Sequence, residues 1–266
     1  MDVIDETCEK GVVERRFDLV VDGETVPGLW WSPEGASGPR PTVLIGHGGT
    51  QHKAVPNVLS LARRLVRHLG YGAVAIDAPD HGDRVADPEA AEKARRRLQR
   101  QIAGGRRPGA TPQPIANDPK AAEAWVRRTE TGVAEWRALV DALEKEDLCG
   151  SGPFGYWGVS MGTAIGLPFV AAEPRIRAAV LGLAGLGNRP GGEAFEAAAR
   201  SLDVPILFVF QNDDELMTRD SGLALWDAIG SSDKTLHLNP GGHVDVPLFE
   251  RESYEAFYVR HLGPSV

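Results

Sequence analysis

The chain has 266 residues, and its apolar and charged fractions, 42% and 25%, are ordinary for a globular protein that buries a large core. The net charge of −8 argues against a nucleic-acid surface, because such surfaces usually carry a basic excess. No apolar run approaches the roughly 20 residues that span a bilayer, and the polar, acidic start differs from a secretory signal. Two cysteines, Cys8 and Cys149, do not make a disulfide framework. We therefore expect a cytoplasmic protein with free thiols and no nucleic-acid or membrane partner, while its oligomeric state stays open.

The predicted elements begin with an antiparallel hairpin. Residues 12–21 (VVERRFDLVV) and 24–33 (ETVPGLWWSP) flank Asp22-Gly23, which is a turn signal. Apolar runs of strand length then alternate with helical patterns, which predicts a mainly parallel sheet with helices on both faces. The later runs that we interpret as strands are PTVLIGHGG, YGAVAIDAPDHG, GPFGYWGVS, IRAAVLGLAG, VPILFVFQND and KTLHLNPGGH. Together they predict about eight strands in one α/β domain over residues 1–266.

A long helix is predicted over residues 119–147. Asp118 would cap this helix, and Pro119 suits its first position. Apolar residues recur along one of its faces. These residues are Val126, Val133, Trp136, Val140 and Leu143.

The segment 85–118 does not fit the alternation of strands and helices. Residues 88–103 favour a short helix that Asp87 caps, and the residues after it are rich in Pro and Gly. Connections of this length are usually lids, binding loops or disorder. We expect a lid that covers a pocket, with a plain surface insertion as the alternative. Its arginines could attract an anionic substrate, but such a run is more often a solvated helix face. They are Arg95, Arg96, Arg97, Arg100, Arg106 and Arg107.

The run Gly158-Val159-Ser160-Met161-Gly162 matches the pattern G-x-S-x-G between a predicted strand and a predicted helix. A chance match is the alternative in a glycine-rich chain, and the strand–turn–helix context argues against it. A serine on such a turn exposes its hydroxyl at the carboxyl end of the sheet, and glycines on either side remove side chains that would strike the neighbouring elements. The N–H of Met161 at the helix start could then face a developing oxyanion. Ser160 is therefore the candidate nucleophile.

A nucleophilic serine needs a base, and the base needs an acid that orients it. Of the seven histidines, only His243 lies in a loop after the last predicted strand, next to two glycines. The acid should lie between serine and histidine in the chain, where Asp213 and Asp214 follow a buried run at once. An Asp pair after a strand is also common as a turn and helix cap. The chain order Ser, Asp, His favours the catalytic interpretation.

A second oxyanion donor is expected after the first central strand, which ends in Gly46-His47-Gly48-Gly49-Thr50. Glycines there let backbone N–H groups approach a substrate closely. A glycine turn alone is weak evidence, but it occurs at the position in the chain order where the partner of Met161 is needed.

These residues together resemble the α/β-hydrolase superfamily over almost the whole chain. The segments GLWWSPEG, PTVLIGHGG and YWGVSMG are most similar to the dienelactone-hydrolase and acyl-peptidase-like branch of small esterases. The resemblance implies a single α/β-hydrolase domain. Many relatives carry a lid between residues 185 and 205, where this chain is short, so the extra length at 85–118 would be the lid insertion.

The resemblance assigns the triad residue by residue. Ser160 would be the nucleophile, His243 the base and Asp214 the acid. Asp214 is preferred to Asp213 because DELMT is similar to the family's D-x-φ-φ-P stretch, in which the first Asp is the acid. In this chain Thr218 replaces the proline of that stretch.

The resemblance also assigns the oxyanion hole to the N–H groups of Met161 and Gly49, with Thr50 as a possible substitute. Two positions depart from the family pattern. Thr163 stands where many relatives carry a third glycine, a change that we expect to affect packing only. His81 lies where relatives often show a glycine-rich loop, and we interpret it as structural rather than catalytic.

The implied function is a serine hydrolase that cleaves a small carboxylic ester through an acyl-enzyme intermediate, with no metal or organic cofactor. Thioesterase, amidase or peptidase activity is the alternative, because the same triad serves each and the fold does not choose among them. A catalytically silent binding protein on the same scaffold is a third possibility. The complete set of Ser, Asp, His and glycine residues argues against it.

Overall fold

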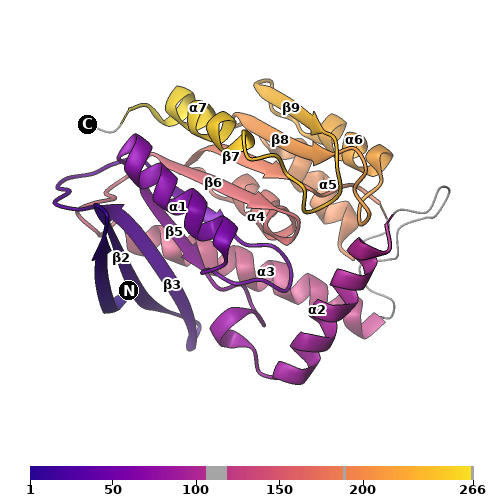
Figure 1. Cartoon of the computed structure of the whole chain (residues 1–266), viewed down its shortest axis with the longest axis horizontal. Coiled ribbons are helices and arrows are strands. Elements are labelled where there is room, and N and C mark those ends of the chain that lie inside the picture. The colour runs from indigo at the N-terminus through magenta and orange to yellow at the C-terminus, as the bar shows by residue number, and fades with distance from the viewer. Residues whose placement is uncertain (106–118, 188–189, 265–266) are drawn as a thin grey trace.

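All nine strands in the described part of the chain belong to one sheet. The computed structural model of the chain describes residues 1–105, 119–187 and 190–264, and Figure 1 shows their arrangement. The strand order is β1-β2-β3-β5-β4-β6-β7-β8-β9. In chain order the strands are β1 (Asp2–Glu9), β2 (Val12–Val21), β3 (Glu24–Pro33), β4 (Thr42–Gly46), β5 (Gly72–Ile76), β6 (Phe154–Val159), β7 (Ile176–Gly182), β8 (Ile206–Gln211) and β9 (Lys234–Asn239).

The sheet divides into an antiparallel edge and a parallel body. Strands β1, β2 and β3 pair antiparallel, and β3 joins β5 in the same way. From β5 to β9 every neighbouring pair is parallel. The expected mainly parallel sheet with an N-terminal antiparallel hairpin is therefore confirmed. The structure adds β1, whose sequence DVIDETCE is exposed throughout and so lacks the half-buried alternation that predicts a strand.

The chain reverses its direction of travel across the sheet between β4 and β6. After β4 it moves to β5 on one side, and it then returns to β6 on the other side of β4. Ligands of open α/β sheets bind outside the carboxyl ends of the strands at such a point. The topology thus marks the carboxyl ends of β4 and β6.

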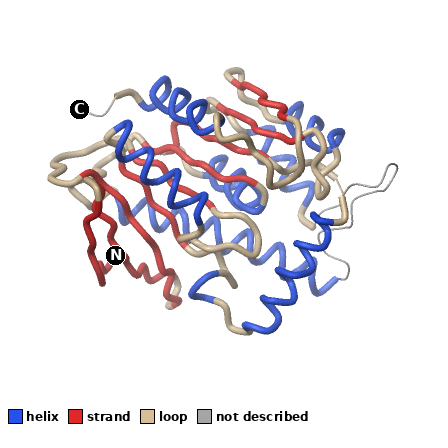
Figure 2. The backbone as a smooth tube through the Cα atoms, in the orientation of Figure 1, coloured by secondary structure: helices blue, strands red, loops and turns tan. Residues whose placement is uncertain are grey.

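Helices cover both faces of the sheet, as expected (Figure 2). Each covered face has its own apolar core. On one face α1 and α7 contribute buried residues, and on the other α3, α4, α5 and α6 do so. The helices are α1 (Pro56–Leu69), α2 (Pro88–Ala103), α3 (Pro119–Leu143), α4 (Met161–Ala172), α5 (Gly192–Ser201), α6 (Arg219–Ala228) and α7 (Glu250–Leu262), and a short 3-10 helix η1 covers Gly82–Arg84.

Helix α3 is shorter than predicted, because it ends at Leu143 instead of residue 147. Leu143 is its last buried side chain, and the residues that follow are mostly charged. Their N–H groups bond three residues back, from Lys145 to Ala142 and from Glu146 to Leu143, so the chain tightens into turns. Asp118, the expected cap of α3, lies outside the described residues. Helix α2 has the predicted bounds, and the Asp87 side chain accepts from two N–H groups of its first turn.

Candidate active site

The turn after β6 holds Ser160 in a conformation that few non-glycine residues adopt, with φ 58° and ψ −118°. Its N–H donates to the C=O of Gly182 on β7 at 2.9 Å. The glycines on either side are required because a side chain at these positions would collide with neighbouring backbone. A Cβ on Gly158 would lie 2.8 Å from the backbone of Gly162, and a Cβ on Gly162 would lie 2.5 Å from the C=O of Gly46. The turn therefore leaves Ser160 half-buried at the carboxyl end of the sheet, as the motif requires.

Ser160, His243 and Asp214 form one chain of hydrogen bonds. The Ser160 hydroxyl donates to Nε2 of His243 at 3.0 Å, and Nδ1–H of His243 donates to Oδ2 of Asp214 at 2.7 Å. The side chains of His243 and Asp214 are buried. Because Nδ1 carries the proton that it donates to the carboxylate, Nε2 of the neutral ring keeps a free lone pair that faces the serine. This is the arrangement of a nucleophile, a base and an orienting acid.

The structure separates the two neighbouring aspartates. Asp213 is exposed, and its carboxylate accepts only from Asn212 and from the N–H of Gly241 among the bonds found in the described chain. Asp214 is buried, and its second oxygen, Oδ1, accepts from the N–H groups of Leu216 and Met217 at 2.8 Å each. These two bonds fix the carboxylate plane, so Oδ2 is held toward the histidine.

Glu215 is a further residue of this site that sequence reasoning missed. Its carboxylate accepts from the backbone N–H of His243 at 2.8 Å, and it lies against Gly242, where a Cβ would collide with it. The side chain therefore holds the loop that carries the histidine. The position of Glu215 next to Asp214 was a signal that it belongs to the site. Nothing in the sequence indicated that its partner is His243, 28 residues away.

The two expected oxyanion donors lie near each other. A Cβ on Gly49 would lie 3.9 Å from Cβ of Met161, the residue after Ser160. Thr50, the alternative donor, has a positive φ of 59°. The loop after β4 and the start of α4 therefore meet beside the serine, which is where the N–H groups of an oxyanion hole are needed.

His47 fastens the loop after β4 to the loop after β5. Its Nδ1–H donates to the C=O of Gly48 at 2.8 Å, and its Nε2 accepts from the N–H of Ala78 at 3.0 Å. An imidazole with one donating and one accepting nitrogen is neutral. Burial lowers the pKa of His47 to about 4, which agrees with the neutral form. The ring of His81 lies 5.4 Å away, and burial lowers its pKa as well.

A buried ion pair joins the same two loops. Asp77, which follows β5, accepts from Nζ of Lys53 at 2.6 Å and from the N–H of Lys53 at 2.9 Å. Nζ of Lys53 also donates to Asp83 at 2.8 Å. Gly82 has a φ of 56° and lies so close to Asp77 that a Cβ would collide with the carboxylate. No sequence motif indicated this pair, which we name the Lys53–Asp77 brace.

Positive φ angles recur after the four central parallel strands. Besides Ser160 after β6, the non-glycine residues Thr50, Asp80 and Leu183 follow β4, β5 and β7 with φ between 49° and 63°. Each such residue costs on the order of 1–3 kcal/mol and persists only where its surroundings fix it. Strained backbone of this kind clusters at functional sites, and here it lies where the strands end toward Ser160.

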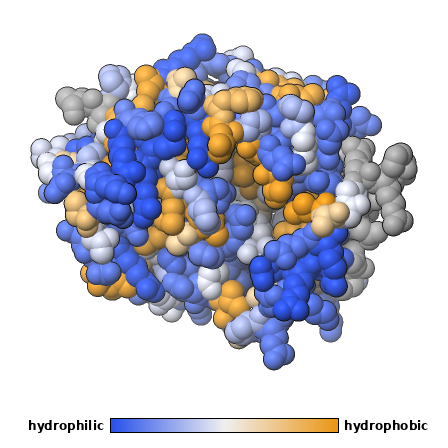
Figure 3. Space-filling view, in the orientation of Figure 1, coloured by the Kyte–Doolittle hydropathy of each residue, from blue (hydrophilic) through white to orange (hydrophobic). Residues whose placement is uncertain are grey.

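The segment that was expected to be a lid is described in part. Helix α2 has no buried residue, and half-buried apolar side chains mark one of its faces, namely Ala91, Leu98 and Ile102. Arg95 and Arg96 pair with Glu92 on the exposed face, and Figure 3 shows hydrophilic surface where α2 lies. Residues 106–118, with Arg106 and Arg107, lie outside the described residues.

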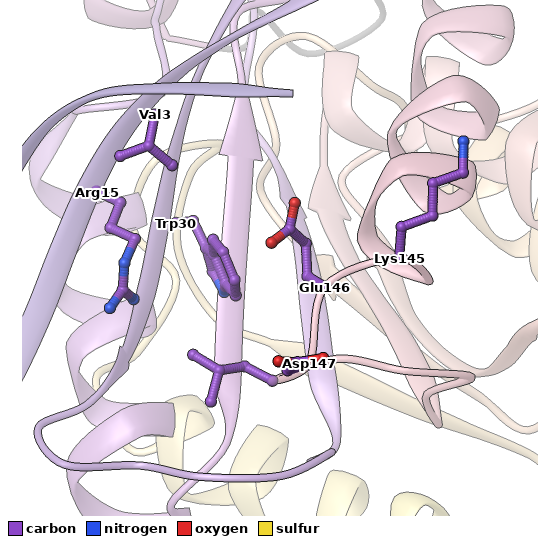
Figure 4. Close-up of a pocket in the computed structure, with 7 residues that line it drawn as sticks. Val3, Arg15, Trp30, Lys145, Glu146 and Asp147 are labelled. Carbon is purple, nitrogen blue, oxygen red and sulfur yellow. The ribbon is translucent and has the colours of Figure 1, made fainter.

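A separate pocket of about 310 Å³ lies between the antiparallel edge of the sheet and the turns that follow α3 (Figure 4). Strands β1 to β3 provide Val3, Arg15 and Trp30, and residues 145–148 close it shortly before β6 begins. None of the expected site residues lines it.

Among the described residues, no three His, Cys, Asp or Glu side chains come together in a way that could hold a metal ion. No helix in that part of the chain has the length and apolar character to cross a membrane.

Several solved structures are similar to this one. A cold-adapted esterase from an Arctic intertidal metagenomic library, in a PEG-bound complex, shares 35% identity, with a TM-score of 0.79 over 98% of this chain and 100% of the other. Acetyl xylan esterase 1 from Thermoanaerobacterium shares 15%, with a TM-score of 0.67 over 96% and 86%. Dienelactone hydrolase from Anabaena variabilis shares 19%, with a TM-score of 0.61 over 95% and 99%.

The chain matches no protein-family profile and no curated protein. The two more distant structures show the shared fold, and the esterase that is 35% identical over the full length shows kinship. The chain belongs to the α/β-hydrolase superfamily, in a branch of esterases.

Proposed function

We propose that the chain is a serine hydrolase that cleaves small carboxylic esters through an acyl-enzyme intermediate. The observation that carries this proposal is the hydrogen-bonded chain from Ser160 through His243 to Asp214 at the elbow after β6. The full-length similarity to a cold-adapted esterase supports an ester as the substrate.

In the proposed reaction Oγ of Ser160 attacks the ester carbonyl while Nε2 of His243 takes its proton. Asp214 holds the imidazole and stabilises its charged form. The N–H groups of Met161 and Gly49 stabilise the oxyanion of the tetrahedral intermediate, since preorganised donors cost no reorganisation at the moment of reaction. His243 then passes the proton to the leaving alcohol. Water, activated by the same histidine, attacks the acyl-enzyme and releases the acid.

We propose further that α2 covers the side of the site at which the acyl group enters, next to Ser160, and so limits the size of that group. The helix begins four residues after η1, and η1 is bound to the end of β5 through the N–H of Asp83, which donates to Asp77. Its apolar face is half-buried although none of its residues is fully buried, so this face contacts other parts of the protein only loosely. A cover excludes bulk water and so strengthens the electrostatic effect of the oxyanion donors.

Turnover of p-nitrophenyl acetate tests the proposed function. The wild type should hydrolyse it with saturation kinetics, and Ser160→Ala should lose at least about 10³-fold in kcat, because the nucleophile is gone. Ser221→Ala is a matched control, because the Ser221 hydroxyl donates to the C=O of Thr218 within the start of α6 and has no place in the proposed reaction. Equal turnover by the wild type and Ser160→Ala would refute the proposal. Absence of turnover on p-nitrophenyl esters, thioesters and anilides alike would support a binding protein instead.

A further inference from the structure

A buried hydroxyl lies next to the turn that carries Ser160. Thr163 is in the first turn of α4, and its side chain is completely buried. Its Oγ1 accepts from the N–H of Gly182 at 2.8 Å. The same oxygen lies 2.8 Å from the C=O of Gly158 and 2.6 Å from the C=O of Gly182, between which its single proton is shared. The hydroxyl therefore joins the start of α4 to the carboxyl ends of β6 and β7.

The strand register explains what this hydroxyl does. Val159 on β6 lies opposite Gly182 on β7 in a parallel pair. In such a pair the N–H and C=O of Gly182 bond to the residues on either side of Val159, which are Gly158 and Ser160. The C=O of Gly182 accepts from Ser160, and its N–H donates to the Thr163 hydroxyl, which also reaches the C=O of Gly158. Thr163 thus takes part in the last rung of the ladder, beside the bond that holds the serine.

The backbone around Ser160 needs such a partner. Its φ and ψ of 58° and −118° are strained, and strain of this kind persists only where the surroundings over-determine the conformation. The nearby Gly158, Gly162 and Gly182 have no side chains that could bond, and close backbone contacts exclude any. The Tyr156 hydroxyl supports the far side of the turn by donating to the C=O of Gly162 at 2.7 Å. Thr163 supports the side that faces β7.

We propose that Thr163 is a positioning residue for Ser160. Its hydroxyl fixes the last rung between β6 and β7, and the Ser160 hydroxyl thereby stays within bonding distance of Nε2 of His243. This inference rests on the proposed function, in which Ser160 is the nucleophile. A displacement of about 1 Å at a reacting atom can cost about 10²-fold in rate, so one buried bond at this place affects catalysis as well as stability.

Two variants that differ in the hydroxyl test the inference. Thr163→Val keeps the branched shape and removes the oxygen, while Thr163→Ser keeps the oxygen and removes the methyl group. We expect Thr163→Val to lower kcat on p-nitrophenyl acetate by about tenfold or more, with KM little changed, because only the reacting geometry is disturbed. Labelling by a fluorophosphonate should slow by a similar factor. Thr163→Ser should retain kcat within about threefold, although both variants lower the melting temperature.

A purely structural role would overturn the inference. In that case Thr163→Val melts earlier but keeps the kcat and the labelling rate of the wild type per folded molecule. Equal losses in Thr163→Ser and Thr163→Val would overturn it too, since the hydroxyl would then not matter. If Thr163→Val does not fold, Thr163→Ala replaces it in the comparison with Thr163→Ser. Ser160→Ala, measured alongside, distinguishes the two failures. Retained turnover in that variant refutes the proposed function and with it the catalytic role of Thr163, whereas lost turnover in Ser160→Ala beside a fully active Thr163→Val refutes this inference alone.

Discussion

The two oxygens of Asp214 have separate partners, and this division distinguishes it from Asp213. Oδ1 accepts from the N–H groups of Leu216 and Met217, which leaves Oδ2 aimed at Nδ1 of His243. The carboxylate of Asp213 instead lies at the surface and bonds to Asn212 and to the N–H of Gly241. The orienting role proposed for the acid therefore belongs to Asp214.

Replacing each aspartate by asparagine tests this assignment. Asp214→Asn should lower kcat by up to about 10⁴-fold, because an amide in this place favours the wrong tautomer of His243. Asp213→Asn is the matched control and should keep kcat within about threefold, because its bonds are exposed. Steady-state hydrolysis of p-nitrophenyl acetate measures both. A large loss in Asp213→Asn with a nearly silent Asp214→Asn would mean that the two roles are reversed.

His47 makes the stability of the fold depend on pH. Its folded pKa of about 4 lies below the ordinary value of 6.5, so the unfolded chain binds a proton more readily between these values. The contribution of neutral His47 to the stability of the fold is therefore complete above pH 6.5, and it is lost as the pH falls toward 4. At about 1.4 kcal/mol for each pKa unit, the loss amounts to about 3 kcal/mol. Urea unfolding at several pH values between 4 and 7 gives the free energy of unfolding as a function of pH. We expect this free energy to rise less steeply with pH in His47→Gln than in the wild type.

Because His81 also has a lowered pKa, it adds a dependence of the same sign in both proteins. Only the difference in slope between the wild type and His47→Gln therefore reports on His47. Identical slopes would show that burial does not hold His47 in its neutral form.

The loops after β4 and β5 act as one unit through the Lys53–Asp77 brace. Both side chains are almost completely buried, whereas the nearby pair of Arg16 and Asp83 is about half exposed. Removing one partner of a buried pair leaves an uncompensated charge, which costs more than losing a surface pair. The brace therefore stabilises the loop that carries Gly49.

Lys53→Met should lower the free energy of unfolding by about 3–5 kcal/mol, because Asp77 stays buried without its cation. The control Arg16→Ala should lower it by about 1 kcal/mol or less. Urea denaturation at pH 7 measures both values. Equal, small losses in the two variants would contradict the buried brace.

Helix α2 should affect which esters enter the site. Replacing Leu98 and Ile102 by serine removes the apolar contacts of its half-buried face, so the cover loosens and longer acyl chains gain access. We expect hydrolysis of p-nitrophenyl hexanoate to rise several-fold relative to the acetate. Arg97→Ser, on the exposed face, should leave the ratio unchanged. If the chain-length profile of a folded double variant equals that of the wild type, α2 is a surface insertion.

For the whole molecule, the sequence predicted the elements whose pattern depends on burial. The parallel strands are apolar runs, the elbow glycines are required by backbone contacts, and the bounds of α2 follow from its cap and glycines. Strand β1 could not be predicted, because all of its residues are exposed and it shows no apolar face. The end of α3 was placed too late, because charged residues after Leu143 have good helix propensity but nothing to pack against.

The residues of the candidate site could likewise be predicted only where a sequence pattern marks them. Ser160, His243 and Asp214 could be chosen by motif and chain order, and the structure brings them into one hydrogen-bonded chain. Glu215 and the Lys53–Asp77 brace could not be chosen, because their partners are distant in the sequence and belong to no motif. Contacts of this kind arise only when the sheet brings the ends of separate strands together.

The central claim is that Ser160 is the nucleophile of a serine hydrolase. The most direct test is to treat the protein with a fluorophosphonate, measure the mass of the intact chain and map the modified peptide. We expect one phosphonyl group per chain, located on Ser160, and no modification of Ser160→Ala under the same conditions. Equal modification of Ser160→Ala, or a label on another residue of the wild type, would contradict it.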